Sequence, residues 1–246
     1  MRAAASLSRS IPFASATLGQ SDRMAFLRKT YAHLGVALVA LALITGGMMR
    51  FFPETSLAMS RWAFAGTWNW LLVLALFMGV GYVGDRLAWS QSSRALQYVG
   101  LGVSVVAQAL LLQPLLWVAM LKLGAVDAQA VILQAVTVTL AIFVGLTATV
   151  FVTRRDFSFL RSALMVGSFA ALGVIVASMI FGFSLGAVFA GAMILLMAGY
   201  ILYQTGQIAR DFPPTAHVAA ALLLFSTIAT LFWYVLQFLM SFGRDE

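Results

Sequence analysis

Residues 162–209 read SALMVGSFAALGVIVASMIFGFSLGAVFAGAMILLMAGYILYQTGQIA, a run of 48 residues without a charged side chain. A single α-helix of this length would measure about 72 Å, at about 1.5 Å per residue. That is more than twice the ~30 Å hydrocarbon core of a bilayer, which about 20 apolar residues can cross. The run therefore predicts two transmembrane helices joined by a tight turn. We expect the turn at residues 181–184, Phe-Gly-Phe-Ser, because glycine permits a tight backbone.

Five shorter uncharged windows lie on either side of this run. They hold 20, 23, 27, 26 and 32 residues, and each has room for one membrane span. The sequence therefore predicts an all-α integral membrane protein with seven transmembrane helices. The expected spans lie near residues 31–49, 67–84, 98–121, 131–152, 162–181, 184–205 and 216–239.

The composition leads to the same protein class. Of the 246 residues, 62% are hydrophobic, 9% are charged and none is cysteine. Soluble domains are usually about 45–50% apolar, so a soluble globular domain is excluded. A disordered chain and a disulfide scaffold are excluded as well. The net charge of +7 comes from scattered basic residues, which predicts no nucleic-acid partner and leaves the lipid bilayer as the main one.

Lysine and arginine are distributed unevenly over the expected loops. With the N-terminus inside, the inner segments hold 11 of them and the outer segments hold 4. The positive-inside rule therefore favours a cytoplasmic N-terminus. The expected organisation is a flexible cytoplasmic tail over residues 1–30, a transmembrane domain over 31–240 and a short tail over 241–246. The first thirty residues are rich in Ala, Ser and Arg, so a mitochondrial transit peptide is the alternative to a cytosolic tail.

No ionisable side chain is expected at mid-membrane depth, where it would be the default functional site. His33 and His217 lie near helix ends without a Cys, His or Asp at ligand spacing, so no metal site is expected. The sequence also lacks the common hydrolase, metalloprotease and nucleotide-binding motifs. We therefore expect neither enzymatic activity nor a cofactor.

Neutral polar and small residues form stripes on four of the expected helices. Such stripes either pack helices together or converge on a hydrated path, and the sequence leaves both readings open. The stripes are Tyr200, Tyr203, Gln204 and Gln207; Thr227, Thr230, Tyr234 and Gln237; Gly100, Ser104 and Gln108; and Gln134, Thr137, Ala141 and Gly145.

Four segments together resemble the Bax inhibitor-1 family, also called the transmembrane Bax-inhibitor-motif family, in a bacterial permease-like branch. The resemblance covers roughly residues 24–243. The segments are FLRKTY at residues 26–31, TVFVTRRDFSFL at 149–160, YILYQTGQI at 200–208 and LLLFSTIATLFWYVL at 222–236.

The resemblance implies a bundle in which the last helix is central and the other six surround it. It also implies a cation leak, usually of calcium. In pH-gated members a pair of aspartates on the last two helices shares a proton, and the matching positions here are Gln204 and Thr227, which cannot ionise. A latch arginine and a loop acidic residue of the family correspond to Arg86 and Asp156; a helix cap is the structural alternative for Asp156.

Three functional hypotheses follow from the residues and the resemblance, and the third is a stress-protective scaffold in a mitochondrial membrane. The first is a cation leak channel or permease, with calcium as a candidate ion, lined by Gln204, Thr227, Tyr203 and Thr230. The second is a membrane regulator that binds another integral membrane protein, such as a quality-control protease. The expected location is a bacterial inner membrane, and a mitochondrial membrane is the alternative.

Overall fold

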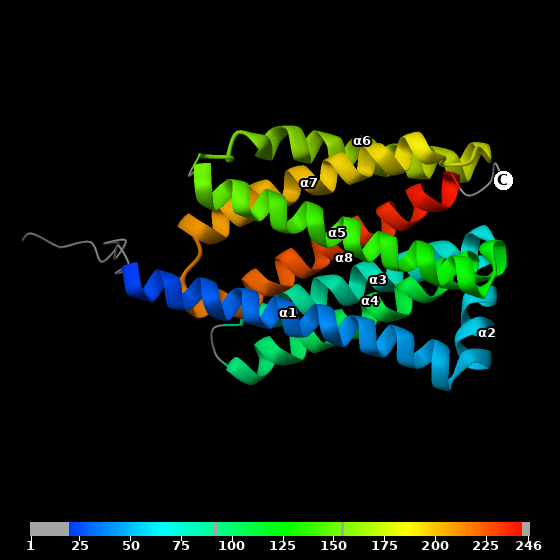
Figure 1. Cartoon of the computed structure of the whole chain (residues 1–246), viewed down its shortest axis with the longest axis horizontal. Helices are drawn as coiled ribbons and strands as arrows, with labels where there is room; N and C mark the ends of the chain where they lie inside the picture. Colours follow the sequence, from blue (N-terminus) through cyan, green and yellow to red (C-terminus); the bar gives the residue numbers. More distant parts are fainter. Residues whose placement is uncertain (1–19, 91–92, 154, 243–246) are drawn as a thin grey trace, which may run out of the picture.

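The structure, a computed structural model, describes residues 20–90, 93–153 and 155–242 and is helical throughout (Figure 1). Seven of its helices are long and apolar enough to cross a membrane, which confirms the expected number of spans. A shorter helix, α2, and the 3-10 turn η1 complete the described part. The bounds are α1 Gln20–Phe51, α2 Pro53–Phe64, α3 Thr67–Ala88, α4 Arg94–Leu123, α5 Ala125–Thr153, α6 Leu160–Phe181, α7 Ala187–Arg210, η1 Pro214–Ala216 and α8 His217–Phe242.

The turn between α6 and α7 lies where the 48-residue run predicted it. Helix α6 ends at Phe181, and Gly182 follows with φ 73°, in the left-handed region that favours glycine. The Gly182 N–H donates to the Ser178 carbonyl at 2.9 Å and closes the last turn of the helix. The division of this run into two spans is confirmed.

Helix α1 begins earlier than expected, at Gln20 instead of residue 31. Residues 20–30 therefore belong to a helix, and the expected flexible tail is wrong for them; residues 1–19 lie outside the described part. The physical reason is burial, because Phe26 is only 2% exposed and belongs to the hydrophobic core. At the other terminus α8 continues to Phe242, and the remaining expected tail, residues 243–246, also lies outside the described part.

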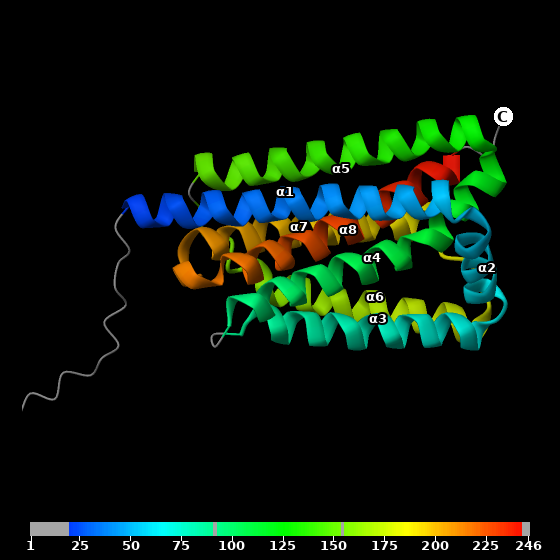
Figure 2. The same cartoon turned by 90° about the horizontal axis from the view of Figure 1, so that it is seen from below.

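Helix α2 is the element that the charge windows did not predict. Its 12 residues correspond to about 18 Å, too short to cross a bilayer, and it lies across one end of the bundle (Figure 2). Buried hydrogen bonds fix it there. Ser56 Oγ donates to Gln113 Oε1 at 2.6 Å, and Trp117 Nε1 donates to Ser56 Oγ at 2.8 Å. Gln113 Nε2 also donates to the Thr45 carbonyl, which joins α1, α2 and α4.

Helix α8 is the centre of the bundle, as the resemblance implied. It packs against α1, α3, α4, α5 and α7, and Leu224, Leu231 and Leu236 on it are fully buried. Helix α6 packs mainly against the outer side of α7 (Figure 1). Because the number of spans is odd, the first span begins and the last span ends at opposite ends of the bundle. We call the end where α1 begins the N-terminal face and the end where α8 finishes, beside α2, the C-terminal face.

Candidate functional site

The predicted pair Gln204 and Thr227 lies at the contact of α7 with α8. Thr227 Oγ1 donates to Gln204 Oε1 at 2.9 Å and also approaches the Leu223 carbonyl at 3.1 Å. Both side chains are buried, at 6% and 7% exposed. The two positions are therefore in direct contact through a hydrogen bond between a hydroxyl and an amide group. Neither group ionises near neutral pH.

A cavity of about 550 Å³ lies on the C-terminal side of this pair. Its walls come from the ends of α2, α3, α4, α6, α7 and α8. Thr230, Gln237 and Gln108 are among its polar lining residues. Thr230 is three residues beyond Thr227 on α8, or about 4.5 Å along the helix axis, so the cavity ends close to the buried pair.

The α4 stripe divides between packing and the cavity. Gly100 lies so close to α3 that an added Cβ would come within 2.6 Å of the Gly84 carbonyl oxygen. Ser104 faces Gly84 in the same contact. Only Gln108 reaches the cavity. Packing therefore accounts for the first two members, whereas Gln108 is buried on the cavity wall.

The α7 stripe also divides. The Tyr200 hydroxyl lies 2.8 Å from Ser168 Oγ and 3.4 Å from the Leu164 carbonyl, so it joins α7 to α6. Gln204 turns to α8. Tyr203 is half-buried and does not line the cavity. Of the four expected lining residues, the structure brings Gln204 and Thr227 together and puts Thr230 on the cavity wall.

The α5 stripe does not converge with the others. Gln134, Thr137, Ala141 and Gly145 are all exposed on the outside of the bundle. Thr137 Oγ1 donates to the Leu133 carbonyl of its own helix at 2.9 Å. A four-residue spacing shows that residues share a helix face, but it does not show whether that face points inward.

The structure also brings together three hydroxyl groups that the sequence pattern did not predict. The hydroxyl of Tyr31 on α1 lies against those of Thr147 on α5 and Thr205 on α7, in the half of the bundle near the N-terminal face. All three oxygens are buried, and none of them makes a well-formed hydrogen bond within the described residues. Thr205 adjoins Gln204 in sequence, but Tyr31 and Thr147 carry no local signal because their partners are more than a hundred residues away.

Arg23 holds the first helix to the end of α7. Its guanidinium donates to three backbone carbonyls, those of Ala209 at 2.7 Å, Phe212 at 2.7 Å and Ile208 at 2.9 Å. The carbonyls at a helix C-terminus have no partner within the helix and carry a partial negative charge, so a cation is favoured there. Nothing in the sequence distinguishes Arg23 from the neighbouring basic residues, because its acceptors are main-chain atoms.

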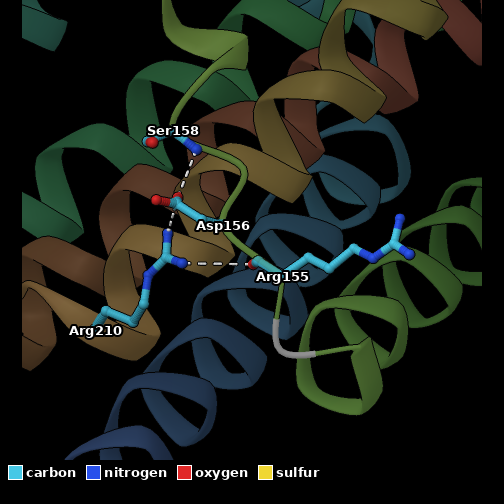
Figure 3. A network of polar contacts seen from close by, with 4 residues as sticks. All are labelled: Arg155, Asp156, Ser158 and Arg210. Atoms are coloured by element: carbon cyan, nitrogen blue, oxygen red, sulfur yellow. Dashed lines mark hydrogen bonds and ion pairs between the residues drawn. The ribbon is translucent and has the colours of Figure 1, made fainter.

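Asp156 forms a second contact at the N-terminal face (Figure 3). Its Oδ1 accepts the Ser158 N–H at 2.8 Å and pairs with the Arg210 guanidinium at 2.6 Å. The backbone N–H and side chain of Ser158, followed by Arg210, lower the pKa of this carboxyl group. The side chains of Arg210 and Asp156 are 37% and 63% exposed, so the ion pair is weak. Asp156 thus orders the α5–α6 loop just ahead of α6, whose N-cap is Phe159.

Arg86 does not meet the Gln204–Thr227 pair. It is exposed near the end of α3, where its Nε donates to the Tyr82 hydroxyl at 3.0 Å and its guanidinium lies over the same ring. This contact within one helix gives no support to a latch.

The two histidines, by contrast, are close together. Their ring centroids are 5.1 Å apart, and His33 Nε2 lies 3.2 Å from the Tyr98 hydroxyl. Sequence spacing could not show this contact between α1 and α8. In residues 20–90, 93–153 and 155–242, no group of three or more His, Asp or Glu side chains is arranged to hold a metal ion.

The sequence of this chain matches that of a known protein family over most of its length. A family model described as "Inhibitor of apoptosis-promoting Bax1" matches residues 23–244. The chain belongs to the Bax inhibitor-1 family. It is 31% identical over 229 residues to Bax inhibitor 1 of Schizosaccharomyces pombe, covering 91% of this chain and 79% of that protein. It is 28% identical to an uncharacterized protein of Pseudomonas aeruginosa, covering 94% of this chain and 96% of that one.

Some of the other similarities cover about half of each chain. Protein lifeguard 4 of Mus musculus is 31% identical over 114 residues, 46% of this chain and 48% of that protein. In this Bax inhibitor-1 family member the match begins at residue 23. The region that resembles the family therefore includes Arg23 and the early part of α1 that sequence analysis had assigned to a tail.

Proposed function

We propose that this protein is a passive pathway for small cations, with calcium as the first candidate, and that the structure corresponds to its closed form. The observation that carries the proposal is the end of the C-terminal cavity one helical turn from the Gln204–Thr227 hydrogen bond. The cavity is the entrance and the buried pair is the constriction. Hydroxyl and amide oxygens can replace part of the water shell of a hard cation.

The other polar group extends this pathway towards the N-terminal face. Beyond the constriction, Tyr31, Thr147 and Thr205 supply three buried hydroxyls between α1, α5 and α7. Arg23 and Asp156 then hold the helix ends and the loop at that face. Opening requires α7 and α8 to separate at the constriction, which breaks one neutral hydrogen bond, worth roughly 0.6 kcal/mol in a membrane bundle.

The test is flux in liposomes that contain dyes for calcium, potassium or protons. Thr227→Val removes the hydroxyl from the constriction with little change in shape. It removes a closing bond of only roughly 0.6 kcal/mol, but it also takes away an oxygen that would replace water around the cation. We expect the second effect to dominate and cation flux to fall several-fold. Thr137→Val is the matched control, because Thr137 makes the same bond to its own helix but faces outward. A protein that conducts none of the three ions, or two variants with equal flux, would reject the proposed pathway.

The neutral constriction also predicts how cation flux depends on pH. Because Gln204 and Thr227 do not titrate, we expect cation flux to be nearly flat from about pH 6 to 8. Gln204→Asp with Thr227→Asp puts two carboxyl groups where the hydrogen bond now lies. Two such groups cannot both ionise cheaply, so one pKa rises and flux becomes pH-dependent. Each single variant should respond more weakly, and a folded, conducting double variant without any response would contradict this assignment.

We propose that the N-terminal face is cytoplasmic, following the excess of Lys and Arg at that end. The chain has no cysteine, so single cysteines report topology directly. Ser158→Cys, in the α5–α6 loop, should react with an impermeant thiol reagent only after the membrane is opened. Phe183→Cys, in the α6–α7 turn, should react in intact bacterial cells from which the outer membrane has been removed. The reverse labelling pattern would show that the N-terminal face is outside the cytoplasm.

A second candidate function is favoured by the α5 stripe. Exposed Gln134 and Thr137 stand beside Ala141 and Gly145, and small residues together with a glutamine suit close contact with another transmembrane helix. As a regulator, the protein would bind an integral membrane partner such as a quality-control protease through this face. Gln134→Leu should then weaken crosslinking to that partner in membranes while leaving liposome flux unchanged. Unchanged crosslinking would count against the stripe as the contact.

A further inference from the structure

The C-terminal cavity is open to the side of the bundle. Its walls include Leu74 and Phe77 of α3 on one side and Ile175 of α6 on the other. In the described part of the chain, α3 packs against α2, α4 and α8, while α6 packs mainly against α7. Figure 2 shows α3 and α6 along the same edge of the bundle, and Figure 1 shows α7 and α8 between them. The opening between these two helices therefore faces the hydrocarbon region of a membrane.

The cavity is long and runs parallel to the helices. Along α4 it extends from Gln108 to Lys122, 14 residues or about 21 Å. Along α8 it extends from Thr230 to Ser241, or about 16 Å. Its volume of about 550 Å³ is within the ~300–1,000 Å³ range of sites that enclose a small ligand. The shape suits an extended chain that lies along the membrane normal.

The chemistry of the walls changes with depth. Aliphatic and aromatic side chains make up most of the wall, and Gln108 and Thr230 lie at its inner end. Three rings follow one another along the wall, Phe64 and Trp70 at 5.0 Å, then Trp70 and Trp233 at 6.2 Å. The mouth is at the membrane interface and holds Lys122, the only charged residue among the described residues that line the cavity. Lys122 is exposed and has no acidic neighbour on the wall, so its ammonium group is available to an anion.

We propose that this cavity binds one acyl chain of an anionic phospholipid from the surrounding bilayer, with the lipid phosphate held by Lys122. The chain enters between α3 and α6 and lies against Trp70 and Trp233. The headgroup stays at the interface, where the Lys122 ammonium group can make a charge-assisted hydrogen bond to the lipid phosphate. Binding needs no ion conduction, but it extends the proposed function, because the same lipid would occupy the entrance of the cation pathway.

Tryptophan fluorescence tests the proposal directly. One variant keeps Trp233 alone, with the other five tryptophans replaced by Phe, and a matched variant keeps Trp68 alone. Trp68 also lies near the start of α3 but is 82% exposed on the outside of the bundle. Each variant is reconstituted in two kinds of phosphatidylcholine vesicle. One contains a small fraction of brominated phosphatidylglycerol, and the other contains the same fraction of brominated phosphatidylcholine. The brominated acyl chains quench tryptophan fluorescence on contact.

We expect brominated phosphatidylglycerol to quench Trp233 several-fold more than brominated phosphatidylcholine, and both lipids to quench Trp68 equally. Lys122→Gln should remove the preference for phosphatidylglycerol. Leu111→Trp fills the middle of the cavity, so in an otherwise unaltered chain it should reduce the phosphatidylglycerol that stays bound in native mass spectrometry. That measurement also compares Lys122→Gln with the unaltered chain, and so does not depend on the single-tryptophan variants folding.

Equal quenching of Trp233 by the two lipids, or bound lipid unchanged by both variants, would overturn the proposal. These outcomes are independent of ion flux. A protein that binds lipid but conducts nothing would reject the cation pathway alone, and one that conducts without retaining lipid would reject the lipid site alone.

Discussion

The two ends of the bundle are held together by different chemistry. At the N-terminal face, charged groups connect distant segments: Arg23 binds three carbonyls at the end of α7, and Asp156 pairs with Arg210. At the C-terminal face, Gln113 and Ser56 make the contacts through neutral groups, and a cavity remains open beside them. A guanidinium can join helices where their ends offer free carbonyls, whereas the amide and hydroxyl groups hold α2 in place and leave a cavity beside it.

The largest effect is expected from Arg23→Ala, which removes three charge-assisted hydrogen bonds from the N-terminal face. Because the site is partly buried, we expect the free energy of unfolding to fall by about 2–3 kcal/mol. Thermal unfolding in detergent measures this. Arg28→Ala is the control, because Arg28 lies on the same helix but is exposed. Equal melting temperatures for the two variants would show that Arg23 does not hold α7.

A smaller effect is expected at the C-terminal face from Gln113→Leu. It removes the bonds to Ser56 and Thr45, at a cost of about 1–2 kcal/mol, because the partners are neutral and Ser56 keeps its bond from Trp117. Gln134→Leu is a matched replacement at an exposed position and should be nearly neutral. Raising the salt concentration should leave the Gln113 effect unchanged. A salt-dependent effect would contradict the neutral character assigned to this face.

The smallest effect is expected from Asp156→Asn, because the ion pair is exposed. Folding lowers the pKa of Asp156 below its ordinary value of 3.8, so its stabilisation is present above that value and is lost as the pH falls through the folded pKa. The melting temperature of the native protein should therefore fall on the acid side more steeply than that of Asp156→Asn, and high salt should reduce the difference. Parallel curves from about pH 5 to 3 would contradict the assignment.

The candidate site was only partly predictable. Gln204 and Thr227 were selected from the resemblance, and the structure joins them. Regular spacing also marked the α5 stripe, which proved to face outward. Nothing in the sequence marks Arg23, Tyr31 or Thr147, because the carbonyls and hydroxyls that they approach lie far along the chain.

The seven spans and the turn at Gly182 follow from the amino-acid sequence. Charged groups are costly in hydrocarbon, and a helix has a fixed rise, so the uncharged windows set the number of crossings. Which polar stripes face inward, where α2 lies and what Arg23 binds depend on how the helices pack. A bilayer favours apolar side chains on both the buried and the exposed surfaces of a helix, so hydrophobic pattern does not distinguish the two. Close packing, such as Gly100 against Gly84, makes that choice.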